Sequence, residues 1–105
     1  MKTVKLYINR DPDFTDYYRV NVFGEGFYDS EGKSVGARVR GDDEWLDDRL
    51  FSLGGTQVLH GGFFGLGNLV HKSQLNEDWG EDEIYAVVEV TGAGTFKTNT
   101  VRGNF

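Results

Sequence analysis

Hydrophobic and polar residues alternate along much of this chain. An apolar residue recurs at every second position in four segments, at 4–8, 18–22, 35–39 and 84–90. A period of two places successive side chains on opposite faces of an extended strand, so one face of each segment is apolar. We predict a half-buried β-strand at each of these four segments.

Three further strands are predicted where apolar residues lie between glycines, at 57–64, 69–71 and 95–101. Turn-forming residues separate the strands, at 10–13 with the only proline, 24–26, 29–32, 77–82 and 92–94. Glycine in the last of these turns supplies the positive φ that a tight hairpin needs. Seven or eight short strands with turns about every ten residues are typical of an antiparallel sandwich or barrel. Residues 1–105 are predicted to form one domain.

Residues 42–51 depart from the alternation. Trp45, Leu46, Arg49 and Leu50 share one face of a helical turn, and two glycines at 54–55 supply a stop. The acidic residues of this segment fit the start of a helix and a loop equally well. We therefore predict one short helix at most, at 42–51, in an otherwise all-β chain.

The run at 20–27, Val-Asn-Val-Phe-Gly-Glu-Gly-Phe, has the form V-x-V-x-G-x-G-F. It resembles the strand and bend of IPT/TIG-type immunoglobulin-like (E-set) domains. Residues 89–101 with Phe105 resemble the closing hairpin of that family, whereas residues 41–79 do not match and lack the family's frequent proline-containing segment. The resemblance implies an immunoglobulin-like β-sandwich that serves as a binding, spacer or assembly module, usually without catalytic residues.

The charge of the chain argues against several classes of partner. Its 11 Lys and Arg against 17 Asp and Glu give a formal net charge of −6. Binding to nucleic-acid phosphates or to anionic lipid needs clustered cations, so we expect neither nucleic acid nor a membrane as a partner. The chain has no cysteine, which excludes disulfides, zinc fingers and thiol nucleophiles.

The N-terminal residues alternate where a signal peptide would carry a continuous apolar core. No apolar run approaches the length of a membrane span. We therefore expect a cytoplasmic protein by default.

Acidic residues gather in short clusters that offer oxygen ligands to a cation. Calcium takes six to eight oxygens, and loops at one end of a sandwich can bring such ligands together. The predicted calcium ligands are Asp42, Asp43, Asp47, Asp48, Asp78 and Asp82. None of the clusters has the spacing of an EF-hand. A solvated acidic surface is the competing interpretation, which charge runs favour in general.

No constellation of catalytic residues stands out in the sequence. His60 and His71 are the only histidines, and Ser52 and Ser73 lack the context of a nucleophile elbow. The glycine-rich run at 61–67 lacks the Lys-Ser/Thr of a phosphate-binding loop. We expect no enzymatic activity.

Aromatic residues are the remaining candidates for a binding surface. We expect Trp45, Tyr28, Phe63 and Phe64 to form sticky exposed positions, and Tyr17, Tyr18 and Tyr85 to be partly exposed. The leading interpretation is a module that binds a protein partner, or a second copy of itself, through a strand edge or an aromatic face. A calcium-binding domain and a carbohydrate-binding module built on Trp45 and nearby tyrosines are the alternatives.

Overall fold

The computed structural model describes residues 1–41, 48–76 and 81–105. Within these ranges the chain forms strands β1 (Thr3–Arg10), β2 (Tyr17–Glu25), β3 (Ser34–Gly41), β4 (Asp48–Gln57), β5 (Phe64–His71), β6 (Asp82–Val90), β7 (Gly94–Lys97) and β8 (Val101–Gly103). Two single 3-10 turns, η1 (Tyr28–Ser30) and η2 (Lys72–Gln74), are the only helical elements of the described residues. None of the described residues forms a helix long and apolar enough to cross a bilayer.

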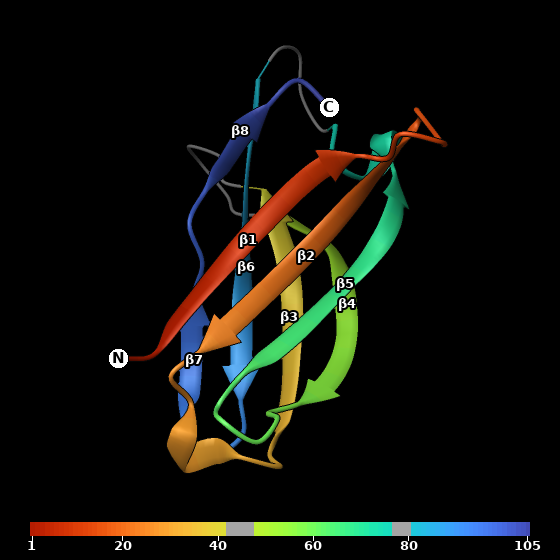
Figure 1. The fold of residues 1–105 in the computed structure, drawn as a ribbon. Coiled ribbons are helices and arrows are strands. Elements are labelled where there is room, and N and C mark those ends of the chain that lie inside the picture. Colours follow the sequence, from red (N-terminus) through yellow and green to blue (C-terminus); the bar gives the residue numbers. More distant parts are fainter. Residues whose placement is uncertain (42–47, 77–80) are drawn as a thin grey trace.

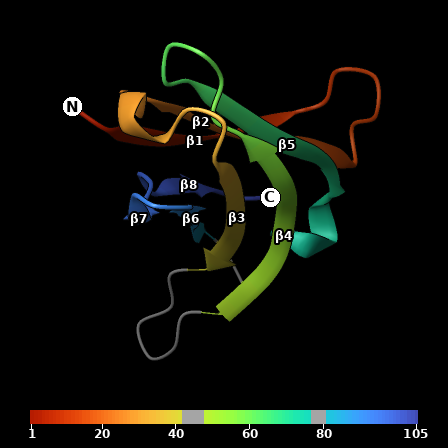
Figure 2. The same ribbon diagram turned by 90° about the horizontal axis from the view of Figure 1, so that it is seen from below.

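The strands pair into two antiparallel sheets that face each other (Figures 1 and 2). The first sheet has the order β1-β2-β5. The second has the order β4-β3-β6-β7, and β8 also pairs with β6. The chain crosses from the first sheet to the second between β2 and β3, returns between β4 and β5, and crosses again between β5 and β6. β4 and β5 lie side by side at one flank of the sandwich. The prediction of an all-β antiparallel sandwich is confirmed.

The core lies between the sheets and is built from the inward phase of each strand. Val20 and Val22 of β2 face Val39 of β3 and Ile84 and Val88 of β6, and all five are fully buried. Removing such side chains from water is the main favourable term of folding, at about 1.5–3 kcal/mol for each. The alternation in the sequence therefore predicts these inward faces correctly.

An aromatic group closes one end of the core. The buried ring of Phe27, just after β2, lies 5.1 Å from the ring of Phe64 in β5 and 5.1 Å from that of Phe96 in β7. The ring of Phe64 lies against Gly24, where a β-carbon would overlap it. Gly24 is therefore required by this close approach, and the expected bend at 24–26 follows at Gly26, which has a φ of 83°.

The helix predicted at 42–51 is wrong over its described part. Residues 48–51 belong to β4, where Asp48 pairs with Gly41 and Arg49 with Arg40. The ladder with the preceding strand β3 outweighs the weak helical preference of the local sequence. Residues 42–47, including Trp45 and Leu46, lie outside the described residues.

Two predicted strands are also divided differently. The strand expected at 57–64 is wrong: β4 ends at Gln57 and β5 begins at Phe64, and between them Gly61 and Gly62 turn the chain with positive φ values of 98° and 82°. The strand expected at 95–101 is interrupted at Thr98. There the hydroxyl oxygen of Thr98 accepts the backbone N–H of Ala86 at 2.9 Å, in place of a backbone carbonyl.

Candidate interaction surface

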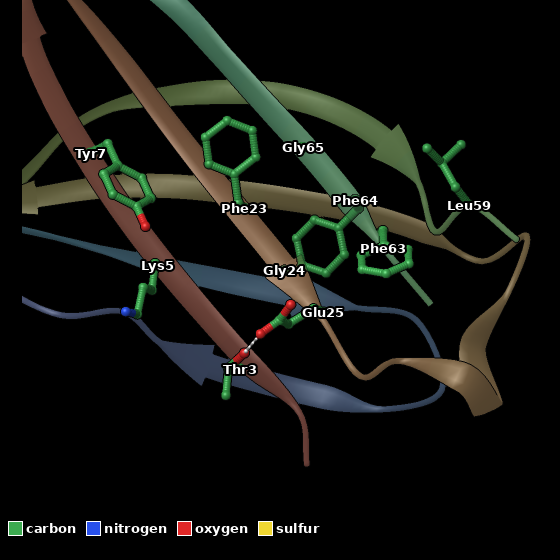
Figure 3. A pocket seen from close by; sticks show the side chains of 10 residues that line it. All are labelled: Thr3, Lys5, Tyr7, Phe23, Gly24, Glu25, Leu59, Phe63, Phe64 and Gly65. Carbon is green, nitrogen blue, oxygen red and sulfur yellow. Dashed lines mark hydrogen bonds between the residues drawn. The ribbon is translucent and has the colours of Figure 1, made fainter. Parts of the chain in front are cut away.

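A shallow pocket of about 450 Å³ lies on the outer face of the three-stranded sheet (Figure 3). Its apolar walls come from β1, β2 and the loop between β4 and β5. We call the four exposed apolar side chains that line it, Tyr7, Phe23, Leu59 and Phe63, the outer-face patch. Large apolar side chains exposed together are unusual on a soluble domain and often mark a contact site.

The strand pattern explains why two of these rings point outward. Tyr7 and Phe23 occupy the polar phase of β1 and β2, opposite to the buried Leu6 and Val22. Their ring centroids lie 5.8 Å apart at an interplanar angle of 62°. Phe23 pairs with Gly65 of β5, which has no side chain, so the ring lies directly against that strand. Covering Gly65 is thus a structural role of Phe23 beside any role in binding.

Backbone hydrogen bonds hold the loop that carries Leu59 and Phe63. The N–H of Leu59 donates to the carbonyl of Phe63 at 2.7 Å, and the N–H of Gly62 donates back to Leu59 at 3.0 Å. The carbonyl of Gly62 accepts from the N–H of Phe27 at 3.1 Å. A β-carbon at Gly62 would lie 2.9 Å from backbone atoms of Phe27, so the contact between loop and η1 needs glycine.

Glu31 fastens the same loop from the other side. Its carboxylate accepts the N–H of Gly61 at 3.1 Å and lies 3.1 Å from Nδ1 of His60. The hydrogen bond from Gly61 and then that with His60 lower the pKa of Glu31 below its ordinary value. Leu59 and Phe63 are therefore presented to solvent from an anchored loop, which limits the entropy lost when a partner orders them.

The aromatic residues predicted to be exposed divide into two groups. Phe63 is 52% exposed and lines the pocket, as predicted, whereas Phe64 is only 3% exposed and its prediction as an exposed residue is wrong. Phe64 starts β5 on the inward phase, so it packs into the core and contributes only to the pocket floor. Tyr28 is exposed in η1 but does not line the pocket.

The remaining predicted aromatic positions are also mixed. Tyr18 and Tyr85 are buried, contrary to prediction, while Tyr17 is exposed. Trp45 lies outside the described residues. Tyr7, Phe23 and Leu59 were missed as surface candidates, although their place on the polar phase or next to turn glycines was visible in the sequence.

The predicted calcium ligands are only partly described. Asp42, Asp43, Asp47 and Asp78 lie outside the described residues, and for Asp48 only the backbone is described. Asp82 starts β6 and is buried. Among the described residues no three His, Asp or Glu side chains are grouped so that they would hold a metal.

The acidic residue Asp11 serves a turn. It is buried, and its Oδ1 accepts the backbone N–H groups of Phe14 and Asp13 at 2.9 Å each. Its Oδ2 accepts Nε of Arg19 at 2.8 Å. The two amides and then the guanidinium lower the pKa of the Asp11 carboxyl below its ordinary value, so the group is ionised at neutral pH. This carboxylate therefore orders the turn between β1 and β2.

His71 and Ser73 form a local cap. Nδ1 of His71 accepts the N–H of Ser73 at 3.2 Å and lies 2.9 Å from its hydroxyl oxygen. The ring packs edge-on to Tyr17 at 5.2 Å. By accepting this backbone N–H, the histidine side chain caps the start of η2.

The free edge of β1 is occupied by a side chain. Oδ1 of Asn99 accepts the backbone N–H of Leu6 at 2.8 Å, and Nδ2 of Asn99 donates to the carbonyl of Leu6 at 3.2 Å. Asn99 lies in the segment between β7 and β8. Its carboxamide thus takes the place of a neighbouring strand at the middle of β1.

No protein-family model matches the chain, and no curated protein matches it. One solved structure that it resembles is the solution structure of a protein assigned to the late embryogenesis abundant (LEA) class, with a TM-score of 0.48 and 10% sequence identity. That alignment covers 100% of this chain and 70% of the other.

Proposed function

We propose that this chain is a non-enzymatic interaction module that binds a protein partner through the outer-face patch. The observation that carries the proposal is the gathering of Tyr7, Phe23, Leu59 and Phe63 from three separate segments around one pocket. Aromatic anchors in a pocket are the usual centre of a protein-binding surface. The resemblance of residues 20–27 to IPT/TIG-type immunoglobulin-like domains supports such a module by fold-level analogy.

Two features favour the patch over other modes of binding. The middle of the β1 edge is already bonded to Asn99, so strand addition there has a competitor within the chain. The rings of Tyr7 and Phe23 are inclined at 62°, which does not make the flat platform on which a sugar ring stacks. A peptide side chain fits such a notch between inclined rings, which makes carbohydrate the weaker alternative.

The charged rim of the pocket adds orientation. Lys5 and Glu25 line it together with the apolar residues, and the hydroxyl of Thr3 donates to Glu25 at 3.4 Å (Figure 3). Rim charges contribute to association rate and register more than to affinity. A partner segment with apolar side chains flanked by charges of both signs suits this rim.

A peptide selection tests the proposal. A displayed peptide library is panned on the wild-type chain with counter-selection on a Phe23→Ser/Phe63→Ser variant that is shown to be folded by circular dichroism. Enrichment of related sequences that bind only the wild type is expected. If every enriched peptide binds the variant equally well, the outer-face patch is not the binding surface.

A calcium site remains a second candidate, favoured by one observation about the second sheet. Gly41 pairs with both Asp48 and Ile84, so the strand ends next to the two acidic segments lie at one end of the sheet. A thermal melt with millimolar calcium and then with excess chelator tests it, because a ligand that binds the folded state raises Tm. An unchanged Tm would assign these carboxylates to a solvated surface.

A further inference from the structure

The backbone of β1 shows which of its groups face the open edge. Leu6 turns both its N–H and its carbonyl toward Asn99, away from β2. Backbone groups alternate in direction along a strand, so those of Val4 and Ile8 also face the edge, while those of Lys5 and Tyr7 pair with β2. Among the described residues, Asn99 is the one that bonds this edge.

Space for a neighbouring chain exists along the same edge. A groove of about 380 Å³ runs beside residues 5–9, bounded by Asn99 and by Val101 of β8. Asn99 is itself an exposed residue. An exposed side-chain cap can be displaced by an incoming strand, provided that the strand returns the two hydrogen bonds that the cap gives up.

The sequence of β1 is complementary to itself in one antiparallel register. If two copies pair with Leu6 opposite Leu6, Val4 lies opposite Ile8 and Lys5 lies opposite Tyr7. In this register every edge-facing residue meets another edge-facing residue, as the hydrogen-bonded pairs of an antiparallel ladder require. Apolar residues then face apolar residues, and the pairs from 4 to 8 oppose no like charges.

We propose that the β1 edge is a pairing surface for a second copy of this chain, and that Asn99 keeps it closed in the monomer. Pairing requires the 98–100 segment to move away from Leu6. That segment is also tied to β6, since Thr98 exchanges hydrogen bonds with Ala86, so the cap does not open without cost. The proposal concerns a surface separate from the outer-face patch and does not rest on the proposed function.

Sedimentation velocity across a concentration series tests the proposal. We expect the wild type to stay monomeric at concentrations where Asn99→Ala forms a dimer. In the variant the two neutral hydrogen bonds from Asn99 to Leu6 no longer compete with pairing to a second copy, so the association constant of the dimer should rise about tenfold or more. Adding Ile8→Pro removes an edge-facing N–H without touching the β1–β2 ladder, and should restore the monomer.

Substitutions at position 7 test the register. In the Asn99→Ala background, Tyr7→Glu places a carboxylate opposite Lys5 of the second copy, whereas Tyr7→Lys places two like charges there. Both remove the same ring, so a tighter dimer for Tyr7→Glu isolates the cross-strand pair. A folded Asn99→Ala that stays monomeric, or a dimer that survives Ile8→Pro, overturns the proposal. If Asn99→Ala does not fold, Asn99→Asp takes its place. This variant keeps the size of the side chain and the oxygen that accepts the Leu6 N–H, but it loses the N–H that donates to the Leu6 carbonyl. A folded Asn99→Asp that stays monomeric, or a dimer of it that survives Ile8→Pro, overturns the proposal in the same way.

Discussion

Replacing Phe63 by serine should weaken binding to a selected peptide strongly and leave the fold intact. Phe63 is 52% exposed, so a partner has about half of an aromatic surface of roughly 200 Å² left to cover. At about 25 cal/mol per Å², that area of about 100 Å² is worth about 2.5 kcal/mol. Allowing for the contacts that serine keeps, we expect a loss of about 2 kcal/mol, or roughly 30-fold in Kd.

Leu69 supplies the matched control. It points outward from β5 of the same sheet and is 47% exposed, but it does not line the pocket. Leu69→Ser should therefore change Kd less than about threefold, within the usual effect of a remote surface substitution. Kd is measured by fluorescence anisotropy of the labelled peptide. The free energy of unfolding, from urea titration, should fall by no more than about 2.5 kcal/mol for Phe63→Ser, because the half of the ring that is already covered in the folded chain has about the same area. Equal effects of the two substitutions on Kd would refute the assignment of the patch.

Three further predictions concern the fold. Phe27→Ala, which empties the aromatic end of the core, should lower the free energy of unfolding in urea by about 3–5 kcal/mol; a loss below 1 kcal/mol would contradict the packing described. Gly24→Ala, whose methyl group meets the ring of Phe64, should cost about 1–3 kcal/mol in the same assay, while Gly36→Ala on β3 has room and should cost less. Because the folded-state pKa of Asp11 is lowered, the stability that this carboxylate contributes is complete above about pH 4 and is lost as the pH falls through the folded pKa. In thermal melts, Asp11→Asn should therefore reduce the fall of Tm at acidic pH. An unchanged fall of Tm would argue against the role of Asp11 in the turn.

The alternation of apolar residues was sufficient to predict β1, β2, β3 and β6 and their inward faces. It works because a period of two has only two phases, and one of them is buried. The alternation fails at Phe63 and Phe64, because two adjacent aromatic residues do not show which of them faces the core. Only the point where the glycine turn ends and β5 begins decides that Phe63 faces solvent and Phe64 faces the core.

The candidate surface was harder to predict than the fold, because it depends on which strands become neighbours. Phe23 lies against Gly65, 42 positions later in the chain, and local sequence carries no sign of that pairing. The bonds between Asn99 and Leu6 span 93 positions. Tyr7 was visible as an aromatic on a polar phase, but nothing local placed Leu59 beside the same pocket.

The position of β6 has a consequence for how the chain acquires its structure. β6 lies in the middle of the second sheet and pairs with β3, β7 and β8. The hairpin of β1 and β2 can form early during synthesis, but β3 and β4 supply only part of the opposing sheet until residues 82–90 have been made. Domains dominated by such distant pairings reach the native state in about milliseconds to seconds, slower than helical domains of this size. Part of the apolar side of the early hairpin therefore stays uncovered until β6 has been made, and that interval is when the nascent chain is most exposed to aggregation and most dependent on chaperones.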